Sequence, residues 1–292
     1  MTSSDSTGVL RYTAFSSDPA GGNPAGVVLD ASGLDDAGML AIAAEVGYSE
    51  TAFVTARSAA DGGAATDGRT LDVRYFSPKA EVPFCGHATV ATAVALAERI
   101  GAGDLLFRTP AGEVPVRVAA GPDGALRATL TSVEPSVAEP NGAVVAEALA
   151  ALRWDAAELD PALPPRIAYA GARHLVLAAA TRARLAALDY DFDRLAALMT
   201  SQDLTTLQLV WRESATVYHV RDPFPVGGVV EDPATGAAAL AFGAYLRTLG
   251  PVPEVLTLRQ GDDLGRPGVL TVELRTGDSR VRVSGEAAPI PE

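Results

Sequence analysis

Cysteine is almost absent from this sequence, and its scarcity excludes several classes of protein. The single cysteine, Cys85, has no partner for an intramolecular disulfide, so a reducing compartment is expected. One thiol also excludes a racemase that works with two opposed cysteines. No cluster of cysteines and histidines has the spacing of a structural zinc site, and we predict neither a metal nor a cofactor.

The common cofactor-binding and nucleophile motifs are missing as well. The sequence contains no G-x-x-x-x-G-K-[ST] phosphate loop, no H-E-x-x-H zinc helix and no G-x-S-x-G nucleophile elbow. No predicted strand is followed by the G-x-G-x-x-G fingerprint of dinucleotide-binding proteins. A nucleotide or a catalytic metal therefore has no recognisable binding motif.

Basic residues are in the minority, since 23 Lys and Arg stand against 36 Asp and Glu and the net charge is −13. Such a chain repels the phosphates of nucleic acids and anionic membrane surfaces. No apolar run reaches the roughly 18 residues of a membrane-spanning helix, and the N-terminus lacks the segments of a secretory signal. We expect a cytoplasmic protein that binds neither nucleic acid nor membrane and acts on a small molecule.

The sequence does contain enough apolar residues for two domains. Its 292 residues are about twice a typical domain length of roughly 150, and 48% are hydrophobic. Residues 134–142, with two prolines and a glycine, are predicted to form a linker. We predict an N-terminal half, 1–132, and a C-terminal half, 133–277, with a final segment, 278–292, that can return to the first half. A further loop of small residues is predicted at 58–68.

Helices are predicted from periodicity and from their end signals. One begins after Asp35 and ends at Gly47. Two others, at 87–100 and 236–249, are almost wholly apolar, which is typical of buried helices. Two segments share their length, a face of small residues and a terminal glycine: GHATVATAVALAERIG and TGAAALAFGAYLRTLG. The similarity indicates either an internal repeat or a chance match in an alanine-rich chain. A true repeat would place two α/β units face to face, each with a helix N-terminus at the cleft.

The residues that can transfer protons lie at junctions between predicted elements. Glu50 follows the first helix, His87 begins the first buried helix, and Asp232 precedes the second. Glu81 and Glu231 occupy similar junctions. A histidine titrates near neutrality, burial raises the pKa of a carboxyl group, and a helix N-terminus holds an anion nearby.

Each of these residues also has an ordinary structural explanation. Glu50 could cap a strand or pair with an arginine, His87 could be a satisfied structural donor, and Asp232 could be a turn or N-cap residue. Cys85 is interpreted as a packing residue, the alternative being a thiol activated by the adjacent helix N-terminus. Two further histidines, both in predicted strands, are interpreted as structural: His174 and His219.

Six motifs occur in order along nearly the whole chain: GNPAGVV (22–28), YSETAFV (48–54), YFSPKAEVPFCGHAT (75–89), EDPATGAAA (231–239), RQGDDLGRPG (259–268) and VRVSGEA (281–287). Together they resemble the PhzF-like proteins of phenazine biosynthesis. The resemblance implies the diaminopimelate-epimerase-like fold, of the α/β (α+β) class, in which two domains each wrap a curved sheet around a central helix. It also implies an active site between the domains and a homodimer.

The resemblance further implies roles for individual residues. Glu50 would be the general acid/base of a cofactor-independent isomerase that moves a proton between carbons of a small unsaturated hydroxy or amino acid. His87 and Asp232 would assist this transfer. The backbone N–H groups at Gly86 and Gly236 would hold the substrate carboxylate.

Asn23 and Ala237 complete the predicted substrate-binding set. The family often has Ser where this chain has Ala237, so a hydroxyl hydrogen bond is lost there and the substrate is left open. Two other functions also stay open. One is an epimerase or racemase of an amino acid derivative, with Glu50 and His87 or Cys85 as opposed acid and base. The other is a non-catalytic metabolite-binding protein of the same fold.

Overall fold

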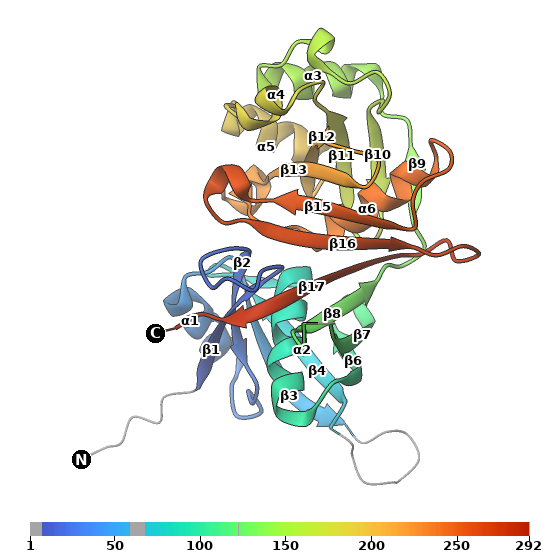
Figure 1. The fold of residues 1–292 in the computed structure, drawn as a ribbon. Helices are drawn as coiled ribbons and strands as arrows, with labels where there is room; N and C mark the ends of the chain where they lie inside the picture. Colours follow the sequence, from blue (N-terminus) through green and yellow to red (C-terminus); the bar gives the residue numbers. More distant parts are fainter. Residues whose placement is uncertain (1–7, 59–67, 122, 292) are drawn as a thin grey trace. The chain divides into compact units, whose positions relative to one another are not determined.

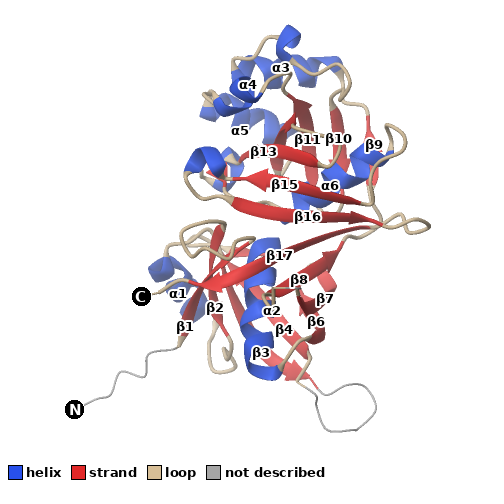
Figure 2. Cartoon of the chain, in the orientation of Figure 1, coloured by secondary structure: helices blue, strands red, loops and turns tan. Residues whose placement is uncertain are grey.

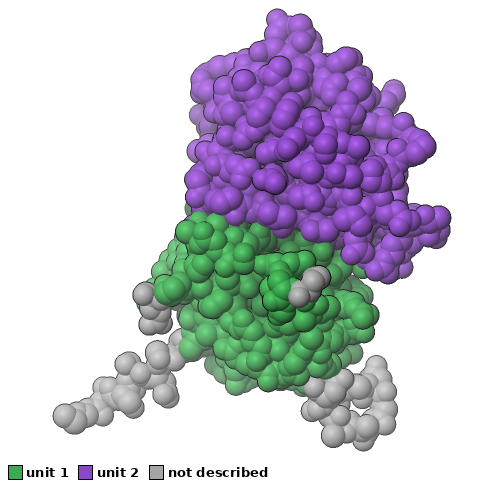
Figure 3. Space-filling model, viewed as in Figure 1, with its two compact units in different colours: residues 1–131, 284–292 green, residues 132–283 purple. Residues whose placement is uncertain are grey.

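The computed structural model of the chain describes residues 8–58, 68–121 and 123–291 (Figure 1). Strands and a smaller number of helices alternate along it (Figure 2). The chain forms two compact units, of which unit 1 comprises Met1–Thr131 and Ser284–Glu292 and unit 2 comprises Ser132–Val283 (Figure 3). Most of the small-residue loop predicted at 58–68 lies outside the described residues.

Unit 1 consists of strands, one short surface helix and one long central helix. In chain order its elements are β1 (Val9–Ala14), β2 (Asn23–Val28), α1 (Asp36–Val46), β3 (Thr51–Ser58), β4 (Thr70–Phe76), β5 (Glu81–Val82), α2 (Gly86–Ile100), β6 (Gly103–Thr109), β7 (Gly112–Ala120) and β8 (Leu126–Thr131). The last strand of the chain, β17 (Val281–Pro289), passes from unit 2 into unit 1, where it pairs antiparallel with β1.

The sheet of unit 1 alternates antiparallel and parallel pairs. Antiparallel pairs β1–β2, β3–β4 and β6–β7 are joined through the parallel pairs β2–β3 and β4–β6. Parallel neighbours need a crossover, and α1 and α2 provide the two crossovers. Helix α2 contacts β1, β2, β3, β7 and β8, so the sheet curves around it.

Helix α2 is buried along most of its length, as its apolar sequence predicts. Eleven of its residues, from His87 to Ala97, are buried. Its two threonines remain compatible with this environment because their hydroxyls donate to helix carbonyls, Thr89 to Cys85 and Thr92 to Ala88, both at 2.7 Å. The prediction of a buried central helix at this position is confirmed.

Helix α1 confirms the end signals read from the sequence. The Asp35 carboxylate accepts a hydrogen bond from the N–H of Gly38 at 2.8 Å, and Gly47 adopts a left-handed conformation with φ of 73° at the other end. Met39 and Ala43 are buried in a small core with residues of β2, β3 and β4. This packing fixes the chain just before β3.

Unit 2 has a similar set of strands and more surface helices. Its elements are β9 (Ser136–Ala138), α3 (Gly142–Leu152), β10 (Arg166–Tyr169), β11 (Arg173–Ala178), α4 (Arg182–Ala186), α5 (Phe192–Ser201), β12 (Thr206–Arg212), β13 (Val217–Pro223), β14 (Glu231–Asp232), α6 (Gly236–Arg247), β15 (Val255–Gln260) and β16 (Gly268–Leu274). The helices α3, α4 and α5 contribute, with β11 and β12, to one hydrophobic core.

The strand pairing of unit 2 repeats that of unit 1. Antiparallel pairs β10–β11, β12–β13 and β15–β16 are joined through parallel pairs β11–β12 and β13–β15. Helix α6 is the central helix and contacts β9, β10, β11, β12 and β16. The sheet approaches it closely at Gly243, where a Cβ would lie 2.8 Å from Val272 Cγ1 and 2.9 Å from Val281 Cγ1. The repeat noticed in two helices therefore extends through the strands around them.

One sequence prediction needs correction. The predicted linker at 134–142 contains a strand, β9, whose Val137 faces Ala168 of β10. Its prolines, Pro135 and Pro140, misled the prediction because they flank the three paired residues and take no part in the ladder. The segments just before the two central helices also contain short strands, the two-residue β5 and β14. Within the described residues, no helix has the length and hydropathy needed to cross a membrane.

Candidate active site

The sequence before β3 places Glu50 at the end of a parallel strand pair in unit 1. The carbonyl of Glu50 accepts the N–H of Gly26 at 3.2 Å, and Gly26 faces Thr51 in the β2–β3 register. A Cβ at Gly26 would lie 2.5 Å from Thr51 Oγ1, so a side chain there would displace the strand that carries Glu50. The GNPAGVV and YSETAFV motifs are thus parts of one local structure.

The start of α2 brings a second group of side chains to unit 1. The β4–β5 hairpin pairs Tyr75 with Val82, and the chain then reaches the N-cap residue Cys85 and the first helical residue Gly86. Cys85 makes no capping hydrogen bond with its side chain, and neither does Thr235, the N-cap of α6. The other α-helices of the described chain are capped by side chains: Asp35, Asn141, Thr181 and Asp191. The first turns of the two central helices therefore keep backbone N–H groups that no N-cap side chain occupies.

A carboxyl group, a thiol and an imidazole converge beside this helix start. Glu50 Oε2 lies 3.4 Å from His87 Nε2, and the Cys85 thiol donates to the same oxygen at 3.5 Å. Cys85 Sγ lies 3.4 Å from His87 Nδ1 and 3.7 Å from Nε2, and Ser49 Oγ is 3.3 Å from Nε2. His87 is 6% and Cys85 7% exposed, and the Glu50 side chain is 14% exposed. The arrangement brings Glu50 and His87, two of the predicted site residues, together.

Burial sets the proton affinity of the Glu50 carboxyl. Loss of hydration raises its pKa, and hydrogen bonds from Ser49 and Cys85 offset part of this rise. A carboxyl group with a raised pKa accepts and returns a proton near neutral pH more readily than an exposed one. The geometry and the pKa of Glu50 both suit a general acid/base.

The acid of unit 2, Asp232, belongs to a hydrogen-bonded loop before α6. Its Oδ2 accepts the Thr235 hydroxyl at 2.6 Å. The Gln260 amide holds this loop, because its nitrogen donates to the Asp232 carbonyl at 2.9 Å and to Thr235 Oγ1 at 3.0 Å, while its oxygen accepts the Thr235 N–H at 2.9 Å. Asp232 is 7% exposed.

A second carboxyl group, Asp222, lies beneath this loop. It faces Asp232 in the β13–β14 register and is completely buried. Burial raises its pKa well above the usual range, while hydrogen bonds with Thr235 and Gln260 act in the opposite direction. Gln260 Nε2 donates to Asp222 Oδ2 at 3.2 Å. Asp222 therefore keeps its proton to a higher pH than an exposed aspartate does.

The other two junction acids are held by arginines. The Glu231 carboxylate accepts hydrogen bonds from Arg221 Nε at 3.0 and 3.1 Å and from its Nη2 at 2.5 Å. The Glu81 carboxylate accepts two hydrogen bonds from Arg74, both at 2.7 Å. Such bidentate pairs fix the two hairpins rather than transfer protons.

The remaining predicted residues have varied settings. Asn23 begins β2 opposite Ala14 and is 1% exposed. Gly86 and Gly236 are the first residues of α2 and α6, and Ala237 follows in a half-buried position. Neither glycine adds a side chain to these first turns, in which Gly86 is half-buried and Gly236 is buried.

The two strand histidines have the structural settings that we inferred. His174 in β11 is completely buried, and burial lowers its pKa to about 3. Its Nδ1 lies 2.8 Å from the Thr206 hydroxyl. His219 in β13 lies between two carboxylates, with Nε2 2.7 Å from Glu213 Oε2 and Nδ1 3.4 Å from Asp262 Oδ2.

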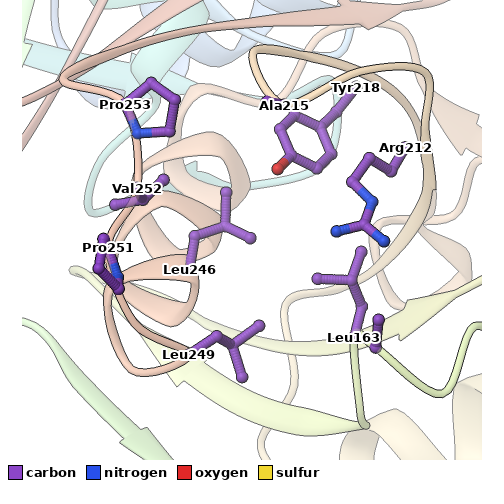
Figure 4. Close-up of a pocket in the computed structure, with 10 residues that line it drawn as sticks. Leu163, Arg212, Ala215, Tyr218, Leu246, Leu249, Pro251, Val252 and Pro253 are labelled. Carbon is purple, nitrogen blue, oxygen red and sulfur yellow. The ribbon is translucent and has the colours of Figure 1, made fainter.

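A cavity in unit 2 lies away from these groups. It has a volume of about 240 Å³, and Tyr218 and Arg212 face leucines and prolines across it (Figure 4). Leu246 and Leu249 place it at the C-terminal end of α6, roughly 15 Å along the helix from Gly236 at a rise of about 1.5 Å per residue. The cavity is therefore separate from the loop that holds Asp232.

Sequence reasoning missed several polar residues of these two groups. Ser49, Thr235 and Gln260 all lie inside motifs that had been recognised, but their side-chain contacts depend on tertiary structure. Asp222 carried no signal, because a lone acid at the end of a strand reads as a solvated turn residue.

The sequence model of the family described as "Phenazine biosynthesis-like protein" matches residues 12–292 of this chain. A protein of Escherichia coli O157:H7, named as the uncharacterized isomerase YddE, is 33% identical over 293 residues, which cover 96% of this chain and 95% of the relative. The trans-2,3-dihydro-3-hydroxyanthranilate isomerase of Pseudomonas aeruginosa is 31% identical over 284 residues, which cover 96% and 95% of the two chains.

A solved structure agrees with these sequence matches. The phenazine biosynthesis protein of the PhzF family from Bacillus anthracis superposes with a TM-score of 0.83 and 27% sequence identity. The superposition covers 97% of this chain and 96% of that one. The similarity thus includes both units and every motif described above.

Proposed function

Because the chain belongs to the phenazine biosynthesis-like protein family and has its diaminopimelate-epimerase-like fold, we propose that it is an isomerase that transfers a proton within a small carboxylate metabolite. The reaction is general acid/base catalysis without a cofactor, with Glu50 as the acid/base. Relatives that match along nearly their whole length are named as isomerases, which supports the reaction class.

The observation that carries this proposal is the environment of Glu50. Its carboxyl group is largely buried, its pKa is raised by that burial, and His87 lies 3.4 Å from the same oxygen that would carry the proton. Removing a proton from carbon needs a poorly hydrated base and nearby donors for the charge that develops. His87 can supply a donor, and Cys85 already donates to Glu50.

The substrate carboxylate is assigned to the first turns of the central helices. The N-cap side chains of α2 and α6 leave these turns uncapped, and the first residues, Gly86 and Gly236, have no side chain to obstruct an anion. In unit 2 the proposal assigns the assisting acid to Asp232 and substrate binding to the half-buried Ala237. In unit 1 it also assigns substrate binding to Asn23. A homodimer and a cytoplasmic location belong to the same proposal, and light scattering after gel filtration would test the dimer.

The central test combines a ligand screen with isotope exchange. Small unsaturated hydroxy and amino acids would be screened by thermal shift, and the best ligand would be followed by NMR in deuterated water. We expect Glu50→Gln to lose roughly two to four orders of magnitude in deuterium incorporation while keeping its folding and its ligand-induced thermal shift. Glu81→Gln is the matched control, because it changes an acid of the same unit that is paired with Arg74 and should keep the exchange rate.

The position of the deuterium distinguishes the candidate functions. Label at a new carbon, with the double bond moved, is the result expected of the isomerase. Label at the original stereocentre would identify an epimerase or racemase instead. A ligand that binds and stabilises the protein without any exchange would indicate a metabolite-binding protein, and undiminished exchange in Glu50→Gln would remove Glu50 from its role.

A further inference from the structure

Glu50, Cys85 and His87 offer three different metal-binding donors within one buried cluster. The donors are a carboxylate oxygen, a sulfur and an imidazole nitrogen. Glu50 lies just before β3, and Cys85 and His87 lie at the start of α2. Sulfur, imidazole and carboxylate ligands together are typical of Zn²⁺ sites. The proton-transfer function proposed above requires the carboxyl group and the imidazole but gives no reason for a thiol between them.

The separations of the three donors match one face of a zinc tetrahedron. With bond lengths of about 2.3 Å to sulfur, 2.0–2.1 Å to nitrogen and 2.0–2.2 Å to oxygen, tetrahedral ligands lie about 3.5–3.7 Å apart for S···O, about 3.5–3.6 Å for S···N and about 3.3–3.5 Å for N···O. The corresponding distances here are 3.5 Å from Cys85 Sγ to Glu50 Oε2, 3.7 Å from Sγ to His87 Nε2, and 3.4 Å from Nε2 to Oε2.

We propose that Glu50, Cys85 and His87 form a three-ligand site for Zn²⁺, with a fourth position open to water or another small ligand. Three protein ligands with one open position are the usual arrangement of non-structural zinc sites. Binding would replace the S–H contact to Glu50 and the 3.3 Å contact between Ser49 and His87 Nε2.

The charges of the cluster are suited to a divalent cation. The thiol releases its proton to solvent on binding, and the resulting thiolate and the Glu50 carboxylate together neutralise the two positive charges of Zn²⁺. A neutral complex is far less costly in a buried position than a charged one. The N-terminus of α2, where Cys85 is the N-cap, also favours the thiolate over the thiol.

Zinc in this position would inhibit proton transfer, and this consequence rests on the proposed function of Glu50. The carboxylate oxygen that faces His87 would be bonded to the metal and would no longer accept a proton from carbon. Removal of the metal by a chelator would restore the free base. The site would therefore act as a reversible switch in which zinc turns proton transfer off. Cys85, which is not one of the two proton-transfer residues, would supply the ligand that the switch requires.

The chain offers a control cluster in unit 2 that differs in one decisive respect. His219 also contacts two carboxylates, but Glu213 approaches Nε2 and Asp262 approaches Nδ1. A metal is bound by one ring nitrogen, so these two carboxylates cannot both join His219 around a single ion. His219→Ala therefore removes a histidine with acidic neighbours without removing the proposed site.

Cobalt(II) is the probe that tests binding without any enzyme assay. We expect one Co²⁺ per chain, an intense near-ultraviolet band from the thiolate bond, visible bands of tetrahedral cobalt, and release of a proton measured in weak buffer. Zn²⁺ should displace the cobalt and abolish these bands. Cys85→Ala should lose the thiolate band and at least about tenfold in affinity, since even outer partners of metal ligands contribute that much. His219→Ala should bind like the unmodified protein.

The proposal is overturned by any of three results. These are the absence of a thiolate band at a stoichiometric excess of cobalt, an unchanged band in Cys85→Ala, or loss of the band in His219→Ala. Circular dichroism and the thermal midpoint of each variant would show whether it is folded, and Cys85→Ser provides a second, smaller change. The cobalt spectrum tests the zinc site, and deuterium exchange tests the proposed isomerase. Failure of one proposal can therefore be distinguished from failure of the other.

Discussion

The hairpins that lead into the two central helices have the same backbone arrangement and different chemistry. EVPFCGH (81–87) and EDPATGA (231–237) each begin with a glutamate held by an arginine of the preceding strand and end one residue after the first helical glycine. The side chains around these shared points differ. His87 corresponds to Ala237, Cys85 to Thr235, and the acid Asp232 to Val82.

The difference teaches how one structural unit serves two roles. The Arg–Glu pair, the proline and the glycine build the turn in both units, so they are needed wherever a strand must enter a central helix without a side-chain cap. The other positions of the two segments carry different side chains. In unit 1 they carry a thiol and an imidazole, and in unit 2 they carry a carboxylate and hydroxyl that Gln260 holds in place.

The largest difference between the two hairpins should appear when each glutamate is removed. The Arg221–Glu231 pair has side chains that are 10% and 1% exposed, whereas those of Arg74–Glu81 are 27% and 33% exposed. Glu231→Ala leaves a buried guanidinium without its partner and should lower the free energy of unfolding by about 3–5 kcal/mol. Glu81→Ala should cost only about 0–1 kcal/mol.

Urea unfolding measures both changes. The two tryptophans, Trp154 and Trp211, lie in unit 2, so their fluorescence follows the unfolding of the unit that Glu231→Ala weakens. Far-ultraviolet circular dichroism reports both units, so for Glu81→Ala the part of its change that the tryptophan fluorescence does not follow measures unit 1. Equal losses in the two variants would show that burial does not distinguish the hairpins.

A second contrast concerns the residue that follows each arginine, Asp222 in unit 2 and Tyr75 in unit 1. The pKa of Asp222 is raised in the folded protein, so above its unfolded pKa of about 4 the unfolded chain loses the proton first and stability falls as pH rises. The loss continues until the folded carboxyl group also ionises. Asp222→Asn should remove this component, which amounts to at most about 1.4 kcal/mol per pH unit.

The measurement is the free energy of unfolding across the acidic to neutral range. Tyr75→Phe is the control, since it removes a buried hydroxyl that lies 2.6 Å from Thr89 Oγ1 and has no charge to lose in this range. It should cost roughly 1 kcal/mol at every pH. An unchanged slope in Asp222→Asn would mean that Asp222 is ionised in the folded chain.

The smallest expected effect is at the residue after the second helical glycine. Ala237→Ser adds to unit 2 the hydroxyl that the family often carries there, at a half-buried position in the first turn of α6. One neutral hydrogen bond contributes about 0.5–1.5 kcal/mol, so a carboxylate ligand from the thermal-shift screen should bind at most about tenfold more tightly. Calorimetry would measure this. Unchanged affinity would indicate that the substrate does not reach this turn.

The fold was predictable to the extent that local patterns decide it. Asp35 begins α1 as its N-cap and Gly47 ends it, as the preferences of these residues predict. The two apolar segments form the central helices. The repeat was matched one residue out of register, because Gly86 was aligned with Thr235. The strand pairing of the two hairpins shows that Gly86 corresponds to Gly236. The sequence did not reveal this register, because a two-residue strand such as β5 is too short to give a periodic signal.

The candidate site was predictable where its residues lie in motifs. Glu50 and His87 were singled out, and the structure brings them together. The proximity of Cys85 to Glu50 and the hydrogen bond from Gln260 to the Asp232 loop join residues that are 35 and 28 positions apart in the chain. Spacing along a sequence does not carry that information, which is why Cys85 was interpreted as a packing residue, with an activated thiol as the alternative.

The path of β17 has a consequence for how the protein is made. Unit 2 is a continuous stretch of chain, whereas unit 1 is completed by residues after 283, of which Ala287–Pro289 pair with β1 and Glu286 accepts a hydrogen bond from Arg127. Unit 1 therefore cannot form its full set of strand pairs until all of unit 2 has been synthesised.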